Sequence, residues 1–422
     1  MINFSKIFRS LSFAAAFAFA FAGPAPAQVA KSVIQGQISA SSANGLVGGV
    51  ILNNIVSSYV DYTTCTSVGG MLYWNSISVP TCLPIGFNGQ SLTIVGGLPT
   101  WTNTFSSVVT SINGQTGAIV LGSITPQVRI SLNTATPVMT ANYAAQTTVY
   151  VTPYIGNLIP IYDGTNMIPT AFAEVSQATT DTTKSPAAVA ANSVYDIFCW
   201  VDTGPTNRCT RGPAWSSQAT RSAGTALVRV NGILLNSVSI TNGPAASRGT
   251  YVGTIASDGS SAIDWNFGGV SASCSAAVFG VWNMYNRVPV TTFLGDSTGS
   301  WTYTTIGWRQ AHGSSTCQVN AVRGFDEDGI TASYNAVGLS GAGPVQMSAG
   351  VGVNSVASYS GTTGFIQSST FALDVVAEYS GLMGLGYVYV APIEWNGSGT
   401  TSSTWFGATT ATQIGFHVRL SQ

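Results

Sequence analysis

Along most of the chain, short runs of alternating apolar and polar residues are separated by turn-forming residues. Turn signals such as Asn-Gly and Asp-Gly recur about every 8 to 15 residues, as in proteins built from short strands. No window of a dozen residues combines a 3.6-residue period with helix caps. The pattern predicts an all-β protein. We expect short β shaft units followed by one or two antiparallel β-sandwich, jelly-roll-like domains.

Three hairpins are predicted most directly, with turns at Tyr162–Thr165, Asp202–Asn207 and Asn231–Gly232. Asp163-Gly164 and Asn231-Gly232 are typical tight-turn pairs, because both residues tolerate positive φ angles. Around the middle turn, strands 194–201 and 208–215 would place Cys199 and Cys209 opposite one another. Both cysteines are equally far from Gly204 at the centre of the turn.

The C-terminal third continues the same pattern. Residues 371–379 alternate as a half-buried strand, and 387–391 and 414–420 resemble closing strands of a sheet. Gly and Ser dominate residues 338–364, which predicts long loops there.

Charged residues are rare. The chain of 422 residues has 14 basic and 15 acidic side chains, or 7% charged residues, where an ordinary soluble domain has roughly 25%. A net charge of −1 provides no electrostatic footprint for nucleic acid or an anionic membrane, so neither is a predicted partner. After residue 30 no apolar run approaches the roughly 20 residues that a spanning helix needs.

The N-terminus resembles a secretory signal peptide over residues 1–27. Two basic residues precede the apolar run Leu11–Ala22, and Ala25–Ala27 fits a small-residue cleavage site. Cleavage there would start the mature protein near Gln28, and an uncleaved membrane anchor is the alternative. We expect residues 28–60 to form a linker.

Six cysteines agree with export to an oxidising compartment. They permit 15 pairings, and proximity in sequence favours Cys65–Cys82, Cys199–Cys209 and Cys274–Cys317; buried free thiols are the alternative. No CxxC spacing occurs, and His312 and His417 are far apart in sequence. We therefore predict no metal site and no cofactor.

Three stretches carry a resemblance to bacteriophage tail-fibre and virion-surface (host-specificity) proteins, strongest over about residues 61–290. Ser111–Leu121 looks like a stalk element of such proteins, and the Gly- and Trp-containing units Gly69–Trp74 and Gly89–Trp101 resemble short β-repeats of fibre shafts. Motifs from Val149 to Val288 resemble a β domain of phage tail proteins. The resemblance implies β stalk units over 61–124 and a phage-type β domain over 125–290. Residues 291–422 would be a C-terminal β domain or a continuation of the same sandwich.

The same resemblance implies a non-enzymatic structural and adhesion protein. It would be a homotrimer in a virion or at a cell surface, bound to other virion proteins and to a cell-envelope glycan or protein. Two alternatives remain open: a secreted glycan-active hydrolase or lyase on a β scaffold, and an exported bacterial adhesin derived from a prophage gene.

No catalytic set stands out in the sequence. Glycoside cleavage needs two carboxylates within roughly 5–10 Å, and Asp296, Asp326, Asp328 and Glu394 are candidates only by elimination. The acidic stretch Gly324–Gly329 could hold Ca²⁺, although a solvated hairpin tip is favoured. His312 is interpreted as a polar loop histidine rather than a member of a Ser-His-Asp triad.

Tryptophans are the better candidates for ligand contact, because indole rings offer broad apolar faces with a polar tip. After Val290 they are Trp301, Trp308, Trp395 and Trp405. We expect residues 291–422 to bind the glycan, and a neutral glycan because basic residues there are few: Arg309, Arg323 and Arg419. An acidic pair facing a Trp-lined cleft would favour the enzyme, and a flat aromatic patch would favour the binding protein.

One further arginine has a predicted structural role. Arg287 is expected to be held by a carboxylate such as Asp264 or Asp196, because a buried guanidinium needs hydrogen-bonded partners.

Overall fold

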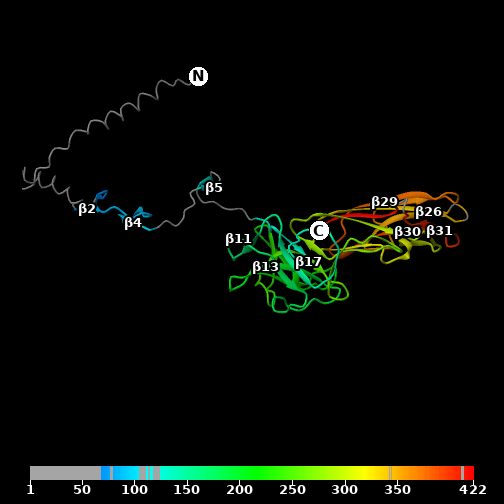
Figure 1. Ribbon diagram of the computed structural model, residues 1–422, viewed down its shortest axis with the longest axis horizontal. Coiled ribbons are helices and arrows are strands. Elements are labelled where there is room, and N and C mark those ends of the chain that lie inside the picture. The colour runs from blue at the N-terminus through cyan, green and yellow to red at the C-terminus, as the bar shows by residue number, and fades with distance from the viewer. Residues whose placement is uncertain are drawn as a thin grey trace, which may run out of the picture. The chain divides into compact units, whose positions relative to one another are not determined.

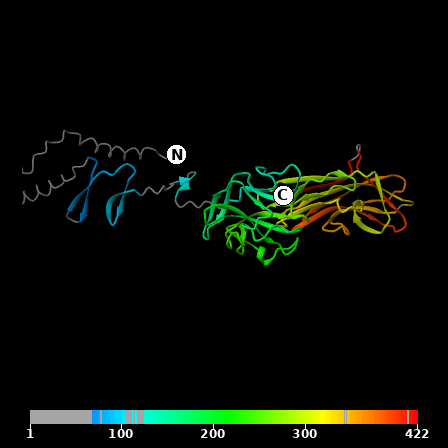
Figure 2. The same ribbon diagram turned by 60° about the horizontal axis from the view of Figure 1, so that its bottom comes forward.

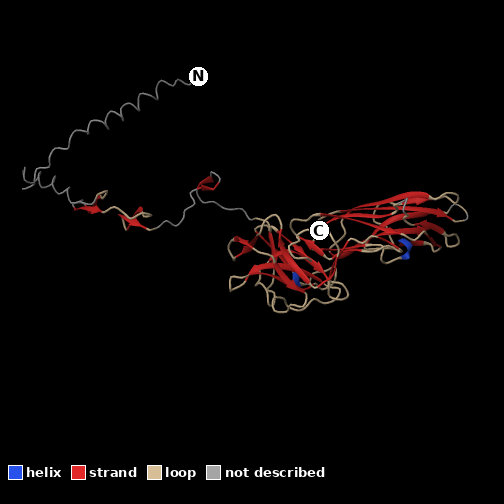
Figure 3. Cartoon of the chain, viewed as in Figure 1, coloured by secondary structure: helices blue, strands red, loops and turns tan. Residues whose placement is uncertain are grey.

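The computed structural model describes residues 68–76, 79–103, 111–112, 115–116, 124–341, 343, 345–409 and 413–422. The expected signal peptide (1–27) and linker (28–60) lie outside these residues. The chain divides into two compact units, Met1–Val120 and Leu121–Gln422, and each is treated separately below. The described residues of both units form strands and loops, together with two short 3₁₀ turns, η3 (Ala223–Thr225) and η4 (Ala311–Gly313) (Figure 3). The predicted all-β fold is confirmed.

The N-terminal unit contains isolated two-stranded hairpins. They are β1 (Met71–Ser76) with β2 (Val79–Leu83), β3 (Ser91–Val95) with β4 (Leu98–Thr102), and β5 (Ser111–Ile112) with β6 (Gln115–Thr116). Gly96 and Gly97 connect β3 to β4 with φ angles of 61° and 85°, a turn that glycine adopts without strain. These hairpins match the short β units predicted for 61–124. The remaining residues of the stalk-like stretch Ser111–Leu121, 113–114 and 117–121, lie outside the described residues.

Two sheets and a hairpin are formed mainly by residues 128–283 of the second unit. A six-stranded sheet has the order β14-β13-β17-β16-β15, with β21 also paired to β17, and a three-stranded sheet has the order β12-β9-β7. The hairpin pairs β10 (Leu158–Tyr162) with β11 (Met167–Ala171). The other bounds are β7 Val128–Ser131, β9 Thr148–Pro153, β12 Val175–Ala178, β13 Val194–Val201, β14 Asn207–Ala214, β15 Leu227–Val230, β16 Ile233–Asn236, β17 Thr250–Ala256 and β21 Val281–Asn283.

The local hairpin predictions hold in this region. Cys199 faces Cys209 across β13 and β14, and the two form a disulfide. Asn231 and Gly232 connect β15 to β16 with φ angles of 47° and 85°, as a primed two-residue turn requires. The Asp163-Gly164 turn lies between β10 and β11.

Two larger sheets contain most of the remaining strands (Figures 1 and 2). The eight-stranded sheet has the order β28-β27-β30-β25-β20-β18-β8, with β24 paired to β30. Its bounds are β8 Tyr143–Gln146, β18 Ile263–Asn266, β20 Ala277–Phe279, β24 Gly307–Gln310, β25 Val319–Arg323, β27 Met347–Val353, β28 Gly364–Ile366 and β30 Gly386–Asn396. The seven-stranded sheet has the order β19-β22-β32-β26-β31-β23, with β29 paired to β26. Its bounds are β19 Val270–Ser271, β22 Pro289–Asp296, β23 Ser300–Tyr303, β26 Ile330–Ser340, β29 Leu373–Gly381, β31 Ser403–Phe406 and β32 Gly415–Ser421.

The boundary expected near residue 290 does not separate two sandwiches. The eight-stranded sheet combines β8, β18 and β20 with strands that follow residue 307. One cluster of buried apolar residues also extends from Val128 to Leu420. Strands from both sides of residue 290 therefore share one sheet and one core. Two pairings, β19 with β22 and β20 with β25, are parallel, so the sheets are not purely antiparallel.

The long loops predicted over 338–364 are wrong in part, because β27 occupies the middle of that range. Its apolar residues Met347, Ala349 and Val351 are fully buried in the core. The intervening Gly350 lies under a ring: a Cβ added there would be 3.0 Å from the Trp308 indole. Glycine at this point makes room for an aromatic side chain of β24, which pairs with the same strand, β30, as β27 does. Composition alone cannot distinguish such a glycine from one in a loop.

Candidate functional site

The four candidate tryptophans fall into two groups. Trp301 of β23 lies opposite Trp405 of β31, and Trp308 of β24 lies opposite Trp395 of β30. Trp405 has no exposed surface and belongs to the hydrophobic core, so the structure removes it from the ligand-contact candidates. Trp301 packs against the same core. Trp308 and Trp395 are half-buried on the outer face of the eight-stranded sheet, as the register with the core residues of β27 indicates.

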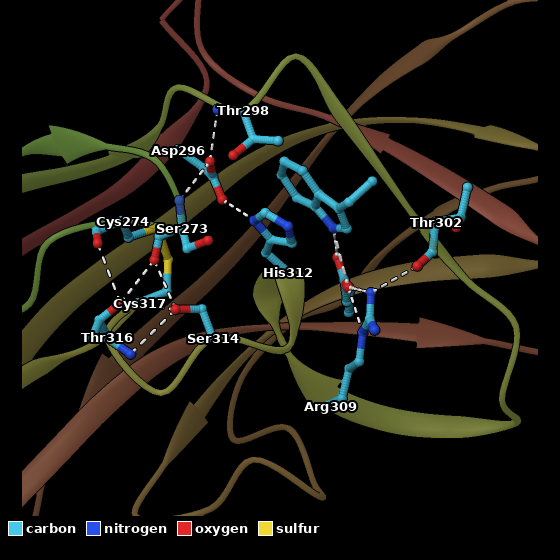
Figure 4. A network of polar contacts seen from close by, with 12 residues as sticks. Ser273, Cys274, Asp296, Thr298, Thr302, Arg309, His312, Ser314, Thr316 and Cys317 are labelled. Atoms are coloured by element: carbon cyan, nitrogen blue, oxygen red, sulfur yellow. Dashed lines mark hydrogen bonds and ion pairs between the residues drawn. A yellow bond between two sulfur atoms is a disulfide. The ribbon is translucent and has the colours of Figure 1, made fainter.

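A polar network surrounds Asp296 and His312 (Figure 4). His312 Nδ1 is 2.5 Å from Asp296 Oδ2 at the end of β22. The His312 ring stacks on the Trp301 indole with a centroid distance of 4.6 Å. Burial alone would raise the pKa of Asp296, but hydrogen bonds from Thr298, His312 and Ser273 outweigh it and hold that pKa below its ordinary value.

A second carboxylate of the network, Glu394 of β30, is completely buried. Its Oε2 accepts a hydrogen bond from Trp301 Nε1 at 2.9 Å, and Arg309 Nε donates to Oε1 at 2.6 Å. Burial raises the pKa of Glu394, and the pairing with Arg309 opposes that rise. Arg309 also lies over the Tyr303 ring, 3.9 Å from its centroid.

The network has no room for a substrate. The hollow that Asp296 and Trp301 line holds about 10 Å³, close to the smallest space that accepts one water. Asp296 and Glu394, two of the carboxylates considered for glycoside cleavage, are thus brought to one region but bonded to protein groups. Among the described residues, no hydroxyl hydrogen-bonds the other ring nitrogen of His312, so a Ser-His-Asp triad is not assembled.

A disulfide holds this network on one side. Cys274 and Cys317 are bonded, as predicted, across a sequence separation of 43. The hydroxyls of Ser314 and Thr316 both donate to the Ser273 carbonyl, at 2.7 and 2.8 Å. Ser273 in turn donates its backbone N–H to Asp296. The third predicted bridge cannot be compared, because Cys65 lies outside the described residues.

Acidic side chains of the stretch 324–329 form ion pairs with an arginine. Arg287 pairs with Glu327 at 2.6 Å and with Asp328 at 3.0 Å, so its predicted partners were wrong. Asp196 instead binds Arg221. Asp264 accepts a hydrogen bond from the backbone N–H of Ala145. No cluster of metal-ligating side chains occurs within the described residues.

The outer face of the eight-stranded sheet carries an aromatic ladder, defined here as Trp308, Trp395, Tyr359 and Phe365. Ser348 lies between Phe365 and Trp395 in the register, and Trp308 follows Trp395. The Trp308 centroid is 6.5 Å from that of Trp395 and 5.5 Å from that of Tyr359. Tyr359 is 54% exposed and Phe365 is 64% exposed. These rings form an accessible aromatic surface from three strands and one loop.

Sequence reasoning missed a polar groove on the outer face of the seven-stranded sheet. We call it the outer groove; its volume is about 630 Å³, and Thr291, Thr331, Ser333, Glu378, His417 and Arg419 contribute to its lining. In β32, exposed His417 and Arg419 alternate with buried Phe416, Val418 and Leu420. That alternation is visible in the sequence, but the strands that complete the groove are not adjacent to it.

Within the described residues, no helix is long and apolar enough to cross a membrane. No protein-family model and no curated protein matches the chain, so the resemblance to phage tail proteins stays an expectation from the motifs quoted above.

Proposed function

We propose that this chain is a non-enzymatic, phage-type adhesion protein that binds a cell-envelope glycan through the sandwich and associates with itself through the N-terminal hairpins. The aromatic ladder is the observation that carries the proposal. Sugar rings present apolar C–H faces that pack on exposed indole and phenol rings. The ladder offers such rings at an accessible surface, whereas the acidic groups of the Asp296–Glu394 network are enclosed.

The ladder predicts a binding defect. We expect the Trp308→Ala/Trp395→Ala double variant to bind its glycan at least about tenfold more weakly on an array of bacterial surface saccharides, because large aromatic anchors dominate binding energies. Phe371→Ala is the matched control, since Phe371 is 71% exposed and is not part of the ladder. Equal binding by the double variant, with an unchanged circular dichroism spectrum, would contradict the proposal.

Self-association is supported by the surface of the N-terminal hairpins. Their exposed large apolar residues are Val68, Met71, Trp74, Ile85, Phe87, Leu92, Ile94, Val95 and Leu98. The sequence has no charged residue between Asp61 and Arg129. An isolated two-stranded hairpin is marginally stable in water, and an uncharged apolar surface is best covered by an identical one. Copies of the same chain therefore fit as partners, and we keep the homotrimer as the proposed state.

Light scattering tests this assembly. The protein starting at Gln28 is expected to have three times the monomer mass at micromolar concentration. Phe87→Asp/Ile94→Asp should shift it toward the monomer, since burying unpaired carboxylates is costly. Ile306→Asp, at a residue 63% exposed in the other unit, should leave the mass unchanged. A monomeric wild-type protein would argue decisively against the assembly.

Export to an oxidising compartment is part of the proposal. The disulfides Cys199–Cys209 and Cys274–Cys317 support it, because such bonds persist mainly outside the cytosol. The same bonds suit a virion-surface protein and an exported adhesin of prophage origin.

A further inference from the structure

The outer groove is built from two rows of side chains that cross the seven-stranded sheet. Thr291, Arg419, Thr331 and Ser380 follow one another across β22, β32, β26 and β29. In the adjacent row, His417, Ser333 and Glu378 follow one another across the last three of these strands. Neighbouring strands are about 4.8 Å apart, so the rows span a surface roughly as wide as a sugar ring and its substituents.

Arg419 is the unusual member of this groove. Every other arginine of the described residues donates a hydrogen bond from its side chain: Arg129, Arg208, Arg211, Arg221, Arg229, Arg248, Arg287, Arg309 and Arg323. Arg419 has no hydrogen-bond or ion-pair partner within the described chain, and it is exposed at the groove. A second hollow of about 320 Å³ adjoins the groove and shares Thr331, Ser380 and Arg419. Arg419 therefore lines both hollows.

We propose that the outer groove binds a saccharide carrying a carboxylate, with Arg419 pairing with that carboxylate. A guanidinium holds a carboxylate through two parallel N–H···O hydrogen bonds. The hydroxyls of Thr291, Thr331, Ser333 and Ser380 exchange hydrogen bonds with the sugar hydroxyls, and Glu378 accepts from them. Phe293 packs against His417 with a centroid distance of 4.5 Å and supports the edge of that row.

The charge of the groove favours a carboxylate over a phosphate. A carboxylate brings one negative charge to the groove, whereas a phosphomonoester brings about −1.5 to −2 at neutral pH and is repelled more strongly by Glu378 in the same groove. This ligand class departs from the neutral glycan expected from the small number of arginines after Val290. Arg309 and Arg323 are engaged in ion pairs inside the protein, so Arg419 is the arginine of that set that can face a ligand.

The inference deepens the proposed glycan-binding function, and titration calorimetry with 3′-sialyllactose, a trisaccharide that carries one carboxylate, tests it. We expect Arg419→Gln to bind at least about tenfold more weakly. Arg229→Gln is the matched control, because Arg229 is exposed on β15 and bonded only to Gly232 nearby. The methyl ester of the same trisaccharide keeps the rings and loses the charge, and it should bind as weakly as the Arg419 variant binds the acid.

Several results would overturn the assignment. They are the absence of any heat of binding with 3′-sialyllactose, equal affinity of wild type and Arg419→Gln, equal affinity for the acid and its ester, or tighter binding of glucose 6-phosphate. The Trp308→Ala/Trp395→Ala variant separates this inference from the proposed function. It should retain 3′-sialyllactose binding, since the two surfaces lie on different sheets.

Discussion

Asp196→Ala is expected to destabilise the second unit by about 3–5 kcal/mol, the cost of leaving a buried charge without its partner. The Asp196 side chain is 1% exposed and that of Arg221 is 15% exposed. Arg221 donates to both carboxylate oxygens, at 3.0 and 3.1 Å. Trp215 and Thr254 donate to the same carboxylate. Removing it therefore leaves three buried donor groups unsatisfied.

Urea unfolding followed by tryptophan fluorescence measures this effect. Glu327→Ala breaks an exposed ion pair with Arg287 and should cost less than about 1 kcal/mol. Asp196→Leu/Arg221→Met removes both charges and should cost clearly less than Asp196→Ala. If Asp196→Ala were no more destabilising than Glu327→Ala, the assignment of Asp196 as a buried anchor would be wrong.

Replacing Cys274 and Cys317 together by alanine should lower the free energy of unfolding by up to about 4 kcal/mol. The reason is that a bridge across 43 residues reduces the chain entropy of the unfolded state. The shorter Cys199–Cys209 bridge, with a separation of 10, should contribute at most about 2.7 kcal/mol by the same argument. The longer bridge also fixes the Ser273 turn that binds Asp296.

Guanidinium unfolding of the two double-alanine variants compares the bridges directly. Adding a reductant to the wild-type protein opens both bridges and should lower the free energy of unfolding by more than either double-alanine variant does. If the Cys199/Cys209 variant lost more stability than the Cys274/Cys317 variant, the expected order of the two bridges would be wrong.

The sequence alone determined the features that depend on neighbouring residues. A hairpin needs only a suitable turn and two strands, so the Cys199–Cys209 pairing could be read from symmetry about Gly204 and is confirmed. The same holds for the Asn231-Gly232 turn, whose residues tolerate the φ angles that it requires. The all-β class followed from the turn frequency. Residues 371–379 were likewise placed close to the observed β29.

Tertiary structure alone decided which side chains meet. Asp296, His312 and Glu394 come from β22, η4 and β30, and no local pattern indicates that they share one network. Alternation along a strand separates two faces but does not say which face is inside. The sequence therefore does not distinguish Trp405 from Trp395, yet Trp405 lies in the core and Trp395 belongs to the aromatic ladder.

The outer groove is a second case in which the sequence indicates the faces of a strand but not the strands that lie beside it. The sequence of β32 shows that His417 and Arg419 share a face, because side chains repeat every two residues. Only the pairing of β32 with β22 and β26, and of β26 with β29, places Thr291, Thr331 and Glu378 beside them. Those pairings connect segments that are far apart in the chain. They form because the opposite face of each strand is buried in a shared core. That burial is a property of the whole sandwich and not of any one strand.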